Sequence, residues 1–80
     1  MVENKTMNEI LRDIVGNNIK KYRKKLGISQ EELAERARLH RTYIGGIERG
    51  ERNITLDSLQ TIADALNIAP VELIVEEPDV

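Results

Sequence analysis

The sequence predicts an all-α domain of five short helices. Apolar residues recur at three- and four-residue steps along most of the chain, which is the spacing of one helix face. Helix-capping residues stand before several of these stretches. Strand signals are missing, because the sequence has neither apolar–polar alternation nor the Asn-Gly and Asp-Gly turns of hairpins. A chain of 80 residues has a small core, for which dimerisation is an ordinary source of stability.

The first helix is expected over about residues 7–26. Thr6 and Glu9 have the spacing of a capping box, and Gly27 stands where a helix-ending glycine is common. Its apolar side is expected to comprise Ile10, Leu11, Ile14, Val15, Ile19, Tyr22 and Leu26. The segment 16–18, "GNN", contains poor helix formers, so a break there is the alternative. The apolar spacing on both sides of this segment favours one continuous helix.

The second and third helices are predicted to form a close pair. Ser29 and Glu32 fit a capping box and indicate a helix over about residues 30–37. Its apolar residues are Leu33, Ala34 and Ala37. Residues 38–40 lead to a third helix that Gly50 closes. Two helices joined by about three residues, here over about 30–49, are the outline of a helix-turn-helix, whose second helix enters the DNA major groove.

The last two helices follow from their caps. Thr55 is expected to begin a fourth helix that ends near Asn67. The inward residues of this helix are expected to be Leu56, Leu59, Ile62, Ala63 and Leu66. Pro70 stands at a first helical position, and Val71–Val75 is expected to form the short fifth helix. We expect one domain over residues 1–80, with frayed ends at 1–6 and 76–80.

Charge is distributed unevenly along the chain, although its net value is only −2. The segment Lys20–Arg52 has ten basic residues against five acidic ones, a net charge of +5. Residues 53–80 have six acidic residues and neither Lys nor Arg. The basic part suits a polyanion, whereas the acidic part is expected to lie away from it. Solvated helix faces of mixed sign are the alternative interpretation.

Several classes of function are disfavoured by residues that the sequence lacks. Without cysteine there is no disulfide, thiolate metal site or cysteine nucleophile. His40 is the single histidine, so we expect an N-cap or turn residue, not a metal ligand or general base. No apolar run approaches the ~20 residues of a membrane span, and the first residues do not form a secretory signal. We therefore expect a cytoplasmic protein that is not an enzyme and has no cofactor.

The stretch "SQEELAERARLHRTYIGGIERGERNITLDSLQTIADALNI" resembles the Cro/lambda-repressor-type helix-turn-helix regulators of the XRE family. The resemblance extends over about residues 19–73. Within that family, "RTY" followed by "IERGERN" is most similar to the controller proteins of restriction–modification systems. The resemblance implies a five-helix lambda-repressor-like fold. It also implies a sequence-specific transcriptional regulator that binds a palindromic operator as a homodimer.

The start of the third helix carries the candidate base-reading residues. Arg41 can bond bidentately to guanine, and Thr42 offers a hydroxyl and a methyl group. Tyr43 adds a flat ring and a hydroxyl. The resemblance implies that these three residues face the groove and that Arg52, in the following loop, reaches bases or phosphates. The alternatives are a solvated arginine at 41, an ordinary first-turn residue at 42 and a partly packed core residue at 43.

Phosphate contacts are expected from Gln30, Gly45 and Asn53, because these positions offer amide donors near helix ends or loops. Gly45 and Gly46 each cost a helix on the order of 1 kcal/mol relative to alanine. We expect their missing Cβ atoms to have a purpose. Gly45 would let the backbone approach phosphate, and Gly46 would keep the groove clear for the base-reading residues.

Other residues are expected to serve the architecture. The resemblance implies a partly buried ion pair between Arg23 and Glu48 that ties the first helix to the third. Arg38 occupies a turn position that often holds Gly or Asn, at a cost of about 1 kcal/mol. The apolar residues that a small monomer would bury poorly, and that we expect at the dimer interface, are Ile68, Val71, Ile74 and Val75.

The expected partners are therefore double-stranded DNA and a second copy of the chain, with RNA polymerase as a further option for an activator. One alternative is an antitoxin-like protein–protein interaction module that uses the same fold. Another is a purely structural helical domain of a larger regulator.

Overall fold

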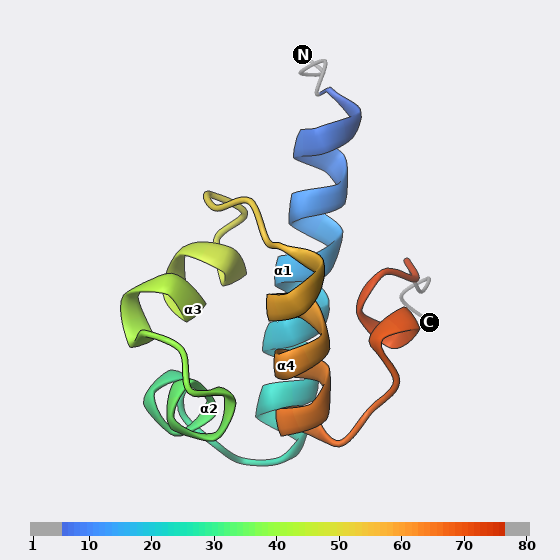
Figure 1. Cartoon of the computed structure of the whole chain (residues 1–80). Coiled ribbons are helices and arrows are strands. Elements are labelled where there is room, and N and C mark those ends of the chain that lie inside the picture. Colours follow the sequence, from blue (N-terminus) through green and yellow to red (C-terminus); the bar gives the residue numbers. More distant parts are fainter. Residues whose placement is uncertain (1–5, 77–80) are drawn as a thin grey trace.

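The computed structural model describes residues 6–76 as helices arranged around one core (Figure 1). The elements are α1 (Met7–Lys25), α2 (Gln30–Ala37), α3 (Arg41–Glu48), α4 (Leu56–Leu66) and a 3₁₀ turn, η1 (Pro70–Leu73). The described residues include no strand, so the all-α prediction is confirmed. None of the helices within residues 6–76 is long and apolar enough to cross a membrane. Fraying is expected at residues 1–6 and 76–80, of which 1–5 and 77–80 lie outside the described residues. Thr6 is described and caps α1.

The fifth helix is not present as predicted. In place of an α-helix over Val71–Val75, the structure has the single turn η1, so residues 6–76 contain four α-helices. The side-chain amide of Asn18, in α1, donates hydrogen bonds to the carbonyl oxygens of Leu73 and Val75, both at 2.9 Å. These bonds pair two carbonyl oxygens that the end of so short a turn leaves without an intrahelical partner.

α1 is continuous through the segment 16–18, as predicted. Thr6 and Glu9 form a complete capping box, with bonds of 2.9 and 3.2 Å. Gly16 lies against the end of α3, where a Cβ atom would overlap the carbonyl oxygen of Ile47. Gly16 and Asn18 therefore stand where α1 contacts other elements closely, whereas Asn17 is exposed.

The caps of α2 and α4 follow the prediction, with one difference. The Ser29 hydroxyl accepts a hydrogen bond from the backbone N–H of Glu32 at 3.0 Å. The second bond of a capping box, from the backbone N–H of Ser29 to the Glu32 side chain, is not formed. The Glu32 carboxylate instead accepts a 2.7 Å bond from Arg36, one turn along α2. Thr55 caps α4, and Asn67 ends it in the left-handed conformation, with φ of 62°.

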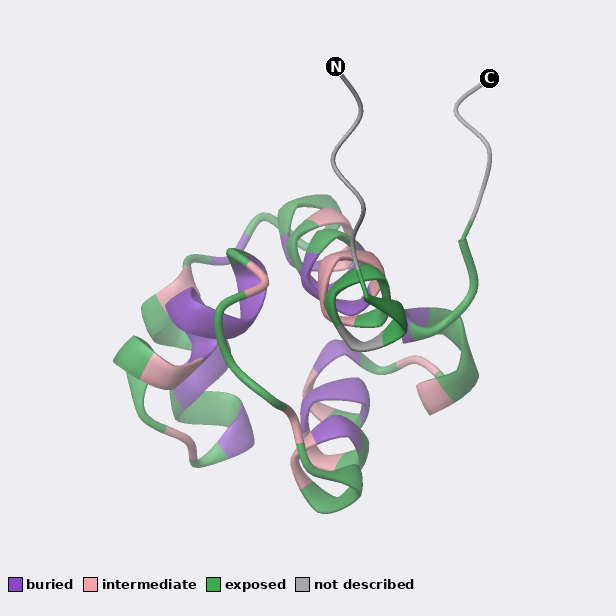
Figure 2. Ribbon diagram, turned by 90° about the horizontal axis from the view of Figure 1, so that it is seen from above, coloured by how far each residue is buried: buried purple, intermediate pink, exposed green. Residues whose placement is uncertain are grey.

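Every helix and η1 contribute to the core, which Figure 2 shows as the buried inner surfaces of the helices. Its apolar residues are Val15, Ile19, Ile28, Leu33, Ala34, Ala37, Ile44, Ile47, Leu59, Ile62, Ala63, Leu66 and Leu73.

Four residues expected on apolar inner faces are exposed instead: Ile10, Leu11, Leu26 and Leu56. The first turns of α1 extend beyond the other helices, which leaves Ile10 and Leu11 with little to pack against (Figure 1). Leu26 is the C-cap of α1. Leu56 begins α4 and is 83% exposed. Periodicity identifies a helix face but not how far that face is covered.

Arg38 adopts the left-handed conformation expected at the turn, with φ of 57° and ψ of 41°. We predict that Arg38→Gly raises the free energy of unfolding by roughly 0.5–1 kcal/mol, because glycine adopts this conformation without a steric penalty. Urea denaturation measures the change. Arg38→Ala is the control, since it removes the side chain and keeps the strain. A lower stability of Arg38→Gly than of Arg38→Ala would contradict the account.

Candidate nucleic-acid interface

The N-terminal end of α3 presents polar side chains to solvent. Arg41 and Thr42 are exposed, whereas Ile44 and Ile47 are buried in the core. His40 is the N-cap of α3, but its side chain makes no capping hydrogen bond. A short helix with its apolar side anchored and a long cationic donor at its open end has the arrangement that major-groove reading requires.

Tyr43 lies between its two expected roles. Its ring is half-buried and packs against the core. Its hydroxyl donates to the backbone carbonyl of Asn53 at 3.3 Å, so it also contacts the loop after α3. In the free protein, Tyr43 thus joins the start of α3 to that loop.

The two glycines of α3 make room for side chains of the same protein. Both are buried. A Cβ at Gly46 would lie 2.6 Å from Cγ of Arg52, so the side chain of this loop arginine lies across Gly46. A Cβ at Gly45 would lie 3.2 Å from Nη1 of Arg49 and 3.4 Å from Oε1 of Gln30. The expected phosphate contact of Gly45 would therefore require those side chains to move. Gly46 accommodates the candidate base reader Arg52, and not the residues at the start of α3.

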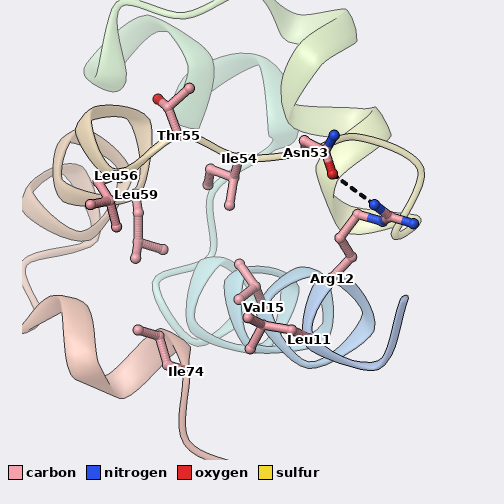
Figure 3. Close-up of a pocket in the computed structure, with 9 residues that line it drawn as sticks. All are labelled: Leu11, Arg12, Val15, Asn53, Ile54, Thr55, Leu56, Leu59 and Ile74. Atoms are coloured by element: carbon pink, nitrogen blue, oxygen red, sulfur yellow. Dashed lines mark hydrogen bonds between the residues drawn. The ribbon is translucent and has the colours of Figure 1, made fainter. Parts of the chain in front are cut away.

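Asn53 is held by an arginine that the sequence analysis did not single out. Nη1 of Arg12, in α1, donates to Oδ1 of Asn53 at 2.7 Å (Figure 3). The side-chain amide of Asn53 retains its N–H donors for a phosphate, and its carbonyl oxygen is engaged. The two residues are 41 positions apart, so no local pattern indicates the pairing.

A buried ion pair joins α1 to α3. Nε of Arg23 lies 2.7 Å from Oε2 of Glu48, and Nη2 lies 3.0 Å from Oε1, which makes the contact bidentate. The two side chains are only 10% and 2% exposed. Nη1 of Arg23 donates to the carbonyl oxygen of Ile28 at 2.9 Å. The guanidinium therefore bonds both to α3 and to the connection before α2.

α2 contributes Gln30 to the same cluster. Nε2 of Gln30 donates to Oε1 of Glu48 at 3.0 Å, so one carboxylate connects three helices. The hydrogen bonds to Glu48 raise the pKa of Arg23 above its ordinary value, although burial acts in the opposite direction. On the alkaline side, the stabilisation is lost only when the pH rises through this raised pKa. The expected phosphate role of Gln30 would use its second amide hydrogen or its backbone N–H.

The candidate dimer face lies on the C-terminal side of the fold. Val71, Ile74 and Val75 are exposed, whereas Ile68 is half-buried against the core. Ile74 also lines an apolar hollow of about 230 Å³ between α1 and the start of α4 (Figure 3). Leu11 and Leu56, which the prediction placed inward, lie at this hollow. The apolar surface is thus larger than predicted.

The described residues contain no group of three or more His, Cys, Asp or Glu side chains able to hold a metal ion.

Comparisons with known proteins agree with this geometry. A helix-turn-helix family model, HTH_3, matches residues 19–73. Control protein C.SmaI of Serratia marcescens is 45% identical over 67 residues, which cover 84% of this chain and 80% of that protein. Control protein C.BamHI of Bacillus amyloliquefaciens is 42% identical over 69 residues, with 85% of each covered. The crystal structure of the restriction–modification controller protein C.AhdI from Aeromonas hydrophila superposes with a TM-score of 0.76. It is 42% identical and covers 78% of this chain and 94% of that one.

Removal of the buried carboxylate tests how strongly the cluster holds α3. We predict that Glu48→Gln lowers the free energy of unfolding by about 3 kcal/mol, because Arg23 is left buried and uncompensated. Glu51→Gln is the matched control, since Glu51 pairs with Arg49 at 3.0 Å on the surface. That change should cost less than about 1 kcal/mol. Equal, small losses in the two variants, measured by urea denaturation, would show that the pair does not hold the fold.

Proposed function

We propose that this chain, which belongs to the HTH_3 helix-turn-helix family, acts as the controller protein of a restriction–modification system. The chain is a DNA-binding transcriptional regulator with the helix-turn-helix fold of the controller proteins. The observation that carries the more specific proposal is the alignment with control proteins along most of both chains. The helix pair α2–α3, which leaves Arg41 and Thr42 exposed at the start of α3, supports the reading of DNA by this chain.

In the proposed mechanism, the N-terminal end of α3 enters the major groove. Arg41 bonds to O6 and N7 of a guanine, and Thr42 contacts a neighbouring base or phosphate. Arg52, supported on Gly46, reaches the DNA from the loop after α3. The start of α2, with Gln30, lies towards the phosphate backbone, where it sets the position of α3 without reading sequence.

Two copies are proposed to bind one palindromic operator. One recognition helix reads only a few base pairs, so a twofold pair with recognition helices about 34–36 Å apart reads two half-sites one helical turn apart. The exposed residues Val71, Ile74 and Val75 are the proposed contact between the copies. The acidic residues of segment 53–80 would lie away from the DNA, on the side of this contact, while the basic segment Lys20–Arg52 faces the DNA.

The remaining parts of the proposal concern partners and location. The relatives to which the chain aligns are regulators, and this supports a function without catalysis. We propose a cytoplasmic location, because an operator target is DNA in the cytoplasm. Contact with RNA polymerase there would allow activation. An antitoxin-like module would use the same fold to bind a protein, and it would have no need of an arginine exposed at the start of α3.

A selection of bound sequences from random duplex DNA tests the proposal. We predict that the wild-type protein enriches a palindromic motif containing a guanine in each half-site. Arg41→Ala should lose the preference for this guanine, because a good bidentate contact contributes about 1–3 kcal/mol of discrimination.

Arg36→Ala is the control, since it removes the same charge from an exposed site on α2 and should enrich the wild-type motif. If the wild-type protein enriches no motif, sequence-specific regulation is wrong. If Arg41→Ala enriches the unchanged motif, Arg41 is not a base reader.

A further inference from the structure

Asn18 is a buried polar residue in the middle of α1, where asparagine is a poor helix former. Its side chain is directed at the segment after α4. Nδ2 donates to the carbonyl oxygens of Leu73 and Val75, both at 2.9 Å. Carbonyls only accept hydrogen bonds, so the side chain must present its NH₂ group, and both hydrogens are used. An asparagine in α1 thus holds two alternate residues of a segment 55 and 57 positions away.

The segment that Asn18 holds has little internal support. η1 is a single 3₁₀ turn of four residues, and a turn this short is not stable by itself. The side chain of Leu73 anchors the segment in the core, where it is fully buried. At the surface, the hydroxyl of Tyr22 donates to Glu72 at 3.1 Å. Within the segment, the backbone N–H groups of Ile74 and Val75 both donate to the carbonyl oxygen of Val71. The bonds from Asn18 are the ones that tie the backbone on both sides of residue 74 to another helix.

The same segment carries the proposed contact between copies. While Leu73 points into the core, Val71, Ile74 and Val75 remain 56%, 42% and 46% exposed. Two copies that meet through so few apolar side chains need them in one arrangement before contact. Otherwise association must also order the segment, and this cost is subtracted from the affinity.

We propose that Asn18 is a positioning residue for homodimerisation. Its two hydrogen bonds fix the backbone of Leu73 and Val75, and this presents Ile74 and Val75 as a preformed surface for the second copy. The inference rests on the proposed function, in which this face joins two copies on the operator. Beyond that function, we infer that dimerisation depends on Asn18, a buried residue of α1 that acts through the segment it holds.

The variants are chosen to separate positioning from folding. Asn18→Asp keeps the shape of the side chain but replaces the NH₂ group by an oxygen that cannot donate when ionised. Asn18→Ser is the uncharged change, because its hydroxyl sits on a shorter side chain and no longer bridges the two carbonyl oxygens. Asn17→Asp is the matched control, because Asn17 is the exposed neighbour on the same helix and undergoes the same change of charge.

The experiment measures the dimer dissociation constant by sedimentation equilibrium, with amide NMR spectra to show that the core signals of α1–α4 are retained. We expect Asn18→Asp to raise the constant about tenfold or more, Asn18→Ser to raise it less, and Asn17→Asp to leave it near the wild-type value. Signals of Ile74 and Val75 should shift in both Asn18 variants. A residue with a purely structural role would lower the melting temperature without changing the dissociation constant of the folded protein.

Three results would overturn the inference. If a folded Asn18 variant has the wild-type dissociation constant, Asn18 does not position the dimer face. The proposed function as a DNA-binding regulator would still stand. Unfolding of both Asn18 variants would assign the residue to folding. A wild-type protein that sediments as a monomer at all concentrations would refute the proposed homodimer itself, together with this inference.

Discussion

The buried ion pair between Arg23 and Glu48 is the contact on which the placement of α3 depends. α3 has only eight residues, and its N-cap makes no side-chain hydrogen bond, so this helix has little stability of its own. Its apolar side attaches it to the core, but apolar contacts alone do not select one rotation or depth. The bidentate pair, with Gln30 as a third member, adds directional contacts to α1 and α2. The exposed start of α3 is thereby held in one orientation.

α1 organises the rest of the fold through residues that are unusual inside a helix. Gly16 lets the end of α3 approach the backbone of α1, and Asn18 holds the segment after α4. Arg12 orients Asn53 in the loop after α3. One helix thus positions both the elements proposed to face DNA and the proposed dimer face, within a chain of 80 residues.

Local signals in the sequence were sufficient to predict α1–α4, because caps and apolar spacing act within a few residues. The resemblance to XRE-family regulators supplied the pairing of Arg23 with Glu48, which spacing alone does not reveal. The predicted fifth helix was wrong, because Pro70 and the apolar residues after it do not show that the segment forms only the 3₁₀ turn Pro70–Leu73, or that Asn18 bonds to it from 55 positions away. Leu56 was placed inward because periodicity does not show where coverage by other elements ends. The base-reading roles of Arg41, Thr42, Tyr43 and Arg52 stay predictions.

A double-mutant cycle on Arg23 and Glu48 tests most directly whether this pair sets the placement of α3. Arg23→Met, Glu48→Leu and the double variant are compared for unfolding free energy and operator affinity. We predict that each single variant loses unfolding free energy and operator affinity, because one charge stays buried without its partner. The double variant should recover much of both losses. Strictly additive losses, or single variants that keep full operator affinity, would contradict this prediction.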